Sequence, residues 1–180
     1  MNRKGEPLFF KDPATAPSFP GEFGTLYLLR RDIKSCMDHK ILWPGTMCIM
    51  AGIDLLGKFL DGKDSNSVSG KRFLDFAKAY LHLSSKDAEP LYQLRNSLLH
   101  SFGLFSAKTG HYRFQLRANG NRAPIICRSG GKIIHVDVLS LNDGFEAAVN
   151  EYQKALHTSD SLRKNFNRMF RRYGKVPISQ

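Results

Sequence analysis

Apolar side chains recur every three or four positions along most of this chain, which is the period of a helix buried on one face. The stretch 22–39, for example, places Phe23, Leu26 and Ile33 at this spacing. Pro90 lies inside another such stretch and predicts either a kink or a helix that begins one turn later. Helices are therefore predicted over residues 22–39, 46–60, 69–80, 84–102, 141–157 and 159–173.

The period changes after residue 111. Tyr112, Phe114 and Leu116 alternate with polar residues, as in a half-buried strand. The segment 119–121, Asn-Gly-Asn, is typical of a turn. Two further strands are predicted over 124–128 and 132–139. The predicted fold is mainly α, an antiparallel helical bundle with a small inserted β-hairpin or meander at about residues 111–139.

The first 20 residues follow neither pattern. They contain Pro7, Pro13, Pro17 and Pro20, and so many prolines exclude a regular helix or a central strand. We therefore expect an irregular N-terminal arm over 1–20 and one helical domain over 21–180. A chain of 180 residues suits a single domain with its own core.

The positive charge of the chain indicates what kind of partner it binds. The chain has 27 Lys and Arg against 16 Asp and Glu, a net charge of +11. Such an excess favours polyanions, because they are attracted over a distance and release counterions on binding. RNA is the expected partner, and the alternative is a protein that is merely basic.

Nothing in the sequence indicates a membrane or secreted protein. The most apolar stretch, 47–60, is interrupted by Asp54 and Lys58 and is too short to span a bilayer. The N-terminus lacks the apolar core of a signal peptide. The three cysteines form no Cys-x-x-Cys pair, so reduced thiols and a cytoplasmic location are expected.

The helix predicted over 84–102 carries the candidate chemistry. Arg95 lies at the edge of its apolar stripe, where a charged group needs a partner or an anionic ligand. Asn96 and His100 are one turn apart on the opposite, polar face. Leu99 lies between the two faces, which suggests a second contact surface such as another subunit. The predicted core stripe contains Leu91, Leu94, Leu98, Phe102 and Phe105.

Residues 95–100 read Arg-Asn-Ser-Leu-Leu-His, and this Arg-Asn-x-x-x-His motif near the end of a bundle helix resembles that of the HEPN superfamily. That superfamily comprises metal-independent RNases and nucleotide-binding domains. The resemblance implies a homodimer in which two motif helices meet, with Arg95, Asn96 and His100 as catalytic residues. It also implies a toxin or defence protein with an antitoxin or other regulatory partner. Some family toxins have a modified Tyr two residues after the His; Phe102 stands here, which excludes control by that modification.

The chemistry of these residue types fits RNA cleavage without a metal or cofactor. A histidine can take or give a proton near neutral pH, and an arginine presents a planar fork to phosphate oxygens. Asn96 can orient the imidazole or bind the phosphate. The alternatives are a non-catalytic HEPN-like module that binds nucleic acid or protein, and a purely structural helical domain. In both of these Arg95 pairs with a carboxylate and His100 is a surface residue.

Three other features have a structural and a functional interpretation. Asp54 forms either a solvated pair with Lys58 or a supporting contact with Arg95 or His100. His135 and Asp137 lie on one side of a strand, as a solvated face or, less simply, as a functional pair. The last helix is flanked by basic residues that are either solvated or an RNA-backbone surface, namely Arg163, Lys164, Arg168, Arg171 and Arg172.

Overall fold

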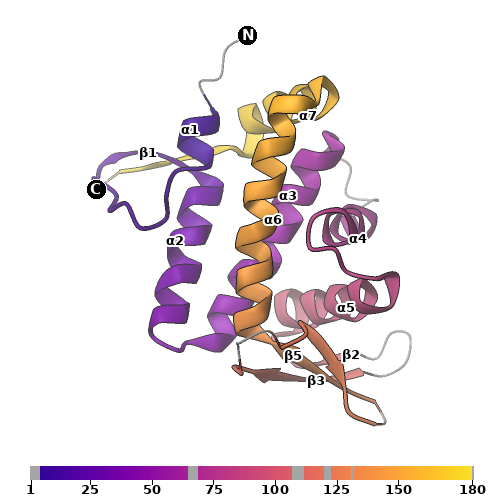
Figure 1. The fold of residues 1–180 in the computed structure, drawn as a ribbon. Coiled ribbons are helices and arrows are strands. Elements are labelled where there is room, and N and C mark those ends of the chain that lie inside the picture. Colours follow the sequence, from indigo (N-terminus) through magenta and orange to yellow (C-terminus); the bar gives the residue numbers. More distant parts are fainter. Residues whose placement is uncertain (1–4, 65–68, 107–111, 120–122, 131, 180) are drawn as a thin grey trace.

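The computed structural model describes residues 5–64, 69–106, 112–119, 123–130 and 132–179 (Figure 1). The described residues are mainly helical, as predicted, and include two small sheets. The helices are α1 (Glu6–Phe9), α2 (Thr25–Asp38), α3 (Leu42–Asp61), α4 (Ser69–Ala79), α5 (Ser85–Ser101), α6 (Val138–Thr158) and α7 (Asp160–Tyr173). The strands are β1 (Gly21–Gly24), β2 (Phe105–Ser106), β3 (Tyr112–Arg117), β4 (Ile126–Arg128), β5 (Ile133–Asp137) and β6 (Lys175–Ile178).

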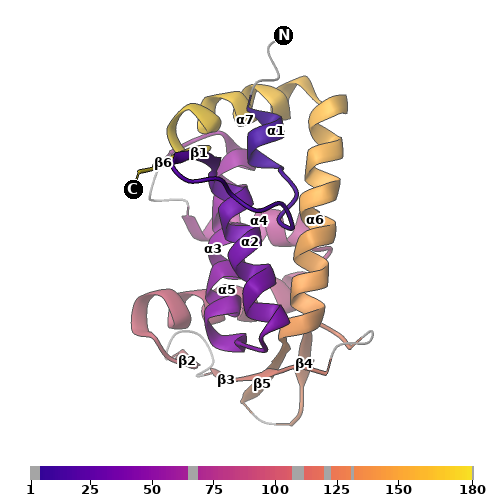
Figure 2. The same ribbon diagram turned by 90° about the vertical axis from the view of Figure 1, so that its left-hand side faces the viewer.

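Helices α2, α3 and α6 run side by side along the long axis of the molecule (Figures 1 and 2). Helices α4 and α5 cross this direction beside α3, α7 crosses one end, and the larger sheet covers the other end. No helix in the described part of the chain is long and apolar enough to cross a membrane. The core lies between the helices and contains, among others, Ile53, Phe76, Leu94, Phe145 and Tyr152.

The prediction of a wholly irregular N-terminal arm is wrong for its first half. Residues Glu6–Phe9 form α1, and Pro7 lies in the first turn, where its missing N–H leaves no intrahelical bond unmade. Phe9 is fully buried and stacks on Phe59, with ring centroids 4.5 Å apart. Its edge meets Phe166 of α7 at 5.4 Å. The N-terminal segment therefore belongs to the core.

Both chain ends are joined by a pairing that the sequence pattern did not predict. Strand β1 pairs antiparallel with β6, with Gly21 opposite Ile178 and Gly24 opposite Lys175. The predicted first helix accordingly begins at Thr25 rather than near residue 22. Four-residue strands carry too short an alternation to be recognised in a sequence.

Helix α5, which carries the motif, begins where its cap predicts. The Ser84 hydroxyl accepts a hydrogen bond from the Asp87 amide at 3.3 Å. Pro90 lies inside the helix and does not delay its start. Proline has no N–H to donate to the Lys86 carbonyl four residues earlier, and the Arg128 guanidinium donates to that carbonyl instead, at 2.6 Å.

The far end of α5 differs from the predicted core stripe. Leu91, Leu94 and Leu98 are fully buried, as expected. Phe102, however, has a left-handed backbone with φ of 47° and is 72% exposed, and Phe105 is 51% exposed. The helical period applies only while the helix continues, and α5 ends at Ser101. Both aromatic rings therefore lie outside the core.

The larger sheet is mixed, so the predicted β-meander is wrong. Its strand order is β2-β3-β5-β4, with β3 parallel to β5 and β4 antiparallel on the far side of β5. This pairing sets Phe114 beside Ile134 and Leu116 beside Val136, so that apolar residues of both strands pack on the helical core. The predicted turn at 119–121 falls largely outside the described residues.

The buried position of Phe9 generates the first prediction. Phe9→Ala removes a ring packed between α3 and α7 and should lower the free energy of unfolding by about 3–5 kcal/mol. Phe19→Ala is the matched control, because Phe19 is exposed and its loss should change stability little. Denaturant unfolding monitored by circular dichroism measures both. Equal effects of the two changes would contradict the placement of the N-terminal segment in the core.

Candidate active site

The motif arginine is held by an acidic residue of a neighbouring helix. Arg95 Nε on α5 donates to Asp54 Oδ2 on α3 at 2.5 Å, and its Nη2 pairs with the same carboxylate. The side chains of Arg95 and Asp54 are only 14% and 19% exposed. A guanidinium held through two nitrogens in a mostly buried position has little freedom to reorient.

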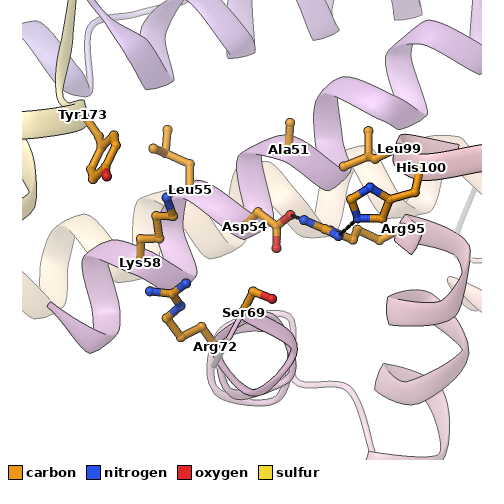
Figure 3. A pocket seen from close by; sticks show the side chains of 10 residues that line it. All are labelled: Ala51, Asp54, Leu55, Lys58, Ser69, Arg72, Arg95, Leu99, His100 and Tyr173. Atoms are coloured by element: carbon orange, nitrogen blue, oxygen red, sulfur yellow. Dashed lines mark hydrogen bonds and ion pairs between the residues drawn. The ribbon is translucent and has the colours of Figure 1, made fainter. Parts of the chain in front are cut away.

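The remaining terminal nitrogen of Arg95 faces the other two motif residues. Arg95 Nη1 donates to Asn96 Oδ1 at 3.0 Å and lies 2.7 Å from His100 Nε2 (Figure 3). Arginine has no acceptor atom, so His100 must accept with an unprotonated Nε2 and carry its hydrogen on Nδ1. The exposed imidazole thus turns its accepting nitrogen toward Arg95.

Of the two contacts predicted for Asp54, the structure contains the one with Arg95. The pair with Lys58 is not formed: Lys58 Nζ lies 3.7 Å from Asp64 and 4.3 Å from the centre of the Tyr173 ring. Burial raises the pKa of Asp54, although the nearby positive charges of Arg95, Arg72 and Lys58 oppose that shift. Desolvation thus outweighs attraction at this carboxylate.

Two cavities flank the Arg95–His100 contact. One, of about 450 Å³, extends from His100 past Asp54 toward Tyr173 (Figure 3). The other, of about 430 Å³, is lined by Asn96, His100 and Phe105 among others. The contact between arginine and histidine therefore borders space on both sides, which a phosphodiester chain would need.

Several residues of the larger cavity were not predicted from the sequence. Ser69 and Arg72 come from the start of α4, and Tyr173 comes from the last residue of α7. Arg72 lies at the edge of the apolar face of α4, one turn before Phe76, and no motif connects it to Arg95. The packing of both α4 and α7 against α3 brings these residues together.

The His135–Asp137 pair has structural roles in the described chain. His135 Nε2 lies 3.0 Å from Arg117 Nη2 and close to the Ser129 hydroxyl. Burial, followed by the charge of Arg117, lowers the pKa of His135. Asp137 caps α6 by accepting from the Ser140 amide at 2.9 Å. Both side chains are buried, so the expectation of a solvated strand face is wrong.

The basic residues of α7 divide into one capping residue and one stripe. Arg163 donates to the Leu156 carbonyl at the end of α6, at 2.6 and 3.0 Å. On the helical wheel the other four fall within about 100° of each other. In this stripe Arg168 donates to the Gly62 carbonyl at 3.1 Å and Arg172 to Asp64 at 3.0 Å. All four residues of the stripe are exposed, namely Lys164, Arg168, Arg171 and Arg172.

Comparison with known proteins adds no relative: no protein-family model, curated protein or solved structure matches this chain. Among the described residues, no three His, Cys, Asp or Glu side chains form a group that could hold a metal ion. The features that indicate a function are therefore the geometry around Arg95 and the motif itself.

A double-mutant cycle tests the contact that holds Arg95. Arg95→Ala, Asp54→Ala and the double variant should give a coupling free energy of about 1–3 kcal/mol, because each single change leaves a mostly buried charge without its partner. The control cycle uses Lys34 and Asp38, an exposed pair 2.8 Å apart on α2. That cycle should give about 0.3–0.5 kcal/mol. Similar values in the two cycles would contradict the buried pairing.

Proposed function

We propose that this protein is a metal-independent endoribonuclease of the HEPN type, which cleaves RNA by attack of a 2′-oxygen on the neighbouring phosphate. One observation carries the proposal: Arg95 Nη1 and His100 Nε2 lie 2.7 Å apart at the edge of a cavity, while Asp54 fixes the arginine from behind. A proton acceptor and a permanent cation thus stand where one phosphodiester would meet both.

In the proposed reaction, the scissile phosphate takes the place of His100 as acceptor for Arg95 Nη1. The freed Nε2 of His100 then accepts the proton of the 2′-hydroxyl as the 2′-oxygen bonds to phosphorus. The bond from phosphorus to the 5′-oxygen breaks, and that oxygen needs a proton. Arg95 stabilises the charge on the pentacoordinate phosphorus throughout. The products are a 2′,3′-cyclic phosphate and a 5′-hydroxyl end.

A second copy of the chain would supply the second proton-transfer group. Support for a homodimer comes from the exposed rings of Phe102 and Phe105, next to the motif. Phe105 lies across from Arg113 on β3, which in turn lies across from the exposed Ile133 on β5. Apolar side chains gathered in this way beside polar residues are typical of interaction surfaces. A partner copy seated there would bring two His100 side chains near each other.

The stripe on α7 is proposed to hold the RNA backbone. Arg172 and Tyr173, which lines the larger cavity, both donate to Asp64, so the end of the stripe is linked to a wall of that cavity. The carbonyl and carboxylate contacts of Arg168 and Arg172 orient the guanidinium groups without using all their donors. Contacts of this kind bind phosphates irrespective of base and weaken with salt.

A non-catalytic nucleic-acid-binding module is the second candidate function. The observation that favours it is the engagement of Arg95, whose donors face Asp54, Asn96 and His100 before any phosphate arrives. If the arginine keeps these contacts when RNA binds, the motif organises the end of α5 and the imidazole is not released. The two functions differ in whether His100 is needed for cleavage.

The decisive variant for catalysis is His100→Ala. Cleavage of single-stranded RNA in EDTA should fall by about 10²–10⁴-fold, the usual contribution of a general acid or base. The fold should be unaffected because His100 is exposed. His39→Ala, which removes another exposed histidine at a helix end, is the control and should cleave like the wild type. Binding of RNA without cleavage by the wild type would support the second candidate instead.

The proposed dimer has its own test. Phe102→Glu together with Phe105→Glu should convert the protein to a monomer, because four buried carboxylates cannot be accommodated at a two-fold apolar contact. Sedimentation velocity at about 50 μM, above the Kd of a micromolar dimer, measures the change. Phe19→Glu, an exposed ring near β1, should leave the dimer intact. A wild-type protein that sediments as a monomer at this concentration would exclude the dimeric site.

A further inference from the structure

Helix α4 approaches α3 closely enough to place an arginine deep beside the candidate active site. Gly57 lies at this contact, where an added Cβ would come within 2.8 Å of the Arg72 carbonyl oxygen. Only glycine permits that approach. Arg72 consequently lies against the same side of α3 as Asp54 and Lys58 (Figure 3).

Arg72 is incompletely satisfied there. It is only 4% exposed, and its Nη1 donates to the Lys63 carbonyl at 2.8 Å. Its Nε is buried and has no hydrogen-bond partner, and no carboxylate of the described chain forms an ion pair with it. A buried cation is costly unless an anion compensates it. The side chain lines the larger cavity, so a ligand in that cavity can supply the compensating charge.

Two further groups face the same part of the cavity. Lys58 stands one turn after Asp54 on α3, and its closest carboxylate is Asp64 at a loose 3.7 Å. Ser69 contributes a hydroxyl from the first residue of α4, where the helix carries partial positive charge. In Figure 3 Lys58 and Arg72 lie on one side of Asp54 and His100 lies on the other, with Ser69 below Asp54. Asp54 is the one carboxylate among the described residues that line the cavity, and it is already paired with Arg95.

We propose that Lys58, Arg72 and Ser69 form a phosphate-binding subsite, separate from the position where Arg95 and His100 meet the scissile phosphate. Its ligand is a phosphate group, and the assignment of that group to the next phosphodiester of an RNA strand rests on the proposed ribonuclease function. The subsite fixes the register of the strand, because a phosphate held beside Lys58 positions its neighbour beside His100. Arg72 and Lys58 are positioning residues in this scheme and take no part in proton transfer.

Binding of 2′-O-methyl oligonucleotides, which cannot be cleaved by 2′-oxygen attack, isolates the subsite from catalysis. A dinucleotide with one phosphate and a trinucleotide with two are titrated into the full-length protein by calorimetry, beside inorganic phosphate alone. The wild type should bind the trinucleotide about tenfold more tightly than the dinucleotide, as expected of one additional charge-assisted contact. Lys58→Gln should abolish this increment.

The control variant is Lys34→Gln, which removes the ammonium of an exposed ion pair with Asp38 on α2, outside the larger cavity. It should keep the tenfold increment. Arg72→Lys retains the charge but not the planar fork and should reduce the increment without the folding risk of a neutral substitution. Equal weakening by Lys58→Gln and Lys34→Gln would overturn the subsite and leave only diffuse attraction.

Different results would contradict the ribonuclease activity and the phosphate-binding subsite. A protein that cleaves no RNA but retains the Lys58-dependent increment has the subsite without the ribonuclease activity. A protein that cleaves RNA and binds both oligonucleotides equally has the activity without the subsite. Competition by inorganic phosphate that is lost in Lys58→Gln would show that the site recognises the phosphate group itself rather than a sugar or base.

Discussion

The ion pair between Arg95 and Asp54 is the interaction on which the candidate site depends. It connects α5 to α3 in a mostly buried position, where its formation must offset the loss of hydration of two charges. The same pair fixes the direction of the guanidinium, so that only Nη1 is left to meet Asn96 and His100. Without Asp54, the Arg95 side chain would lose the contact that holds it at the edge of the cavity. The geometry of the candidate site is thus inseparable from the packing of two helices.

Local patterns in the sequence predicted the longer helices, α2 to α7, the strands β3, β4 and β5, and some of their ends. The periodic leucines of α5 are buried, and Ser84 and Ser159 cap their helices through bonds to nearby amides. The errors involve contacts between distant parts of the chain. Phe9 is buried against Phe59 and Phe166. Strand β3 pairs with β5 as a parallel neighbour rather than with β4. Neither choice is encoded in the spacing of neighbouring residues.

The candidate site shows the same division. Helical geometry alone places Asn96 and His100 within one turn, and the motif singles out Arg95 beside them. The role of Asp54 stayed open in the sequence, because an acidic residue four positions before a lysine usually pairs with it. Arg72 was not identified at all, since its approach depends on Gly57 and on the crossing of α4 over α3. Asp54 and Arg72 reach the candidate site only because helices distant in sequence pack against each other.

The most direct test of the central claim is the chemistry of the RNA ends. Wild-type protein in EDTA should cut a single-stranded RNA to products with 2′,3′-cyclic phosphate and 5′-hydroxyl ends, identified by mass spectrometry. One 2′-deoxyribose at the mapped cleavage position should prevent cutting there and leave other positions unaffected, because the 2′-oxygen is the proposed nucleophile. Products with 5′-phosphate ends, or equal cutting at the deoxyribose position, would contradict an active site built on Arg95 and His100.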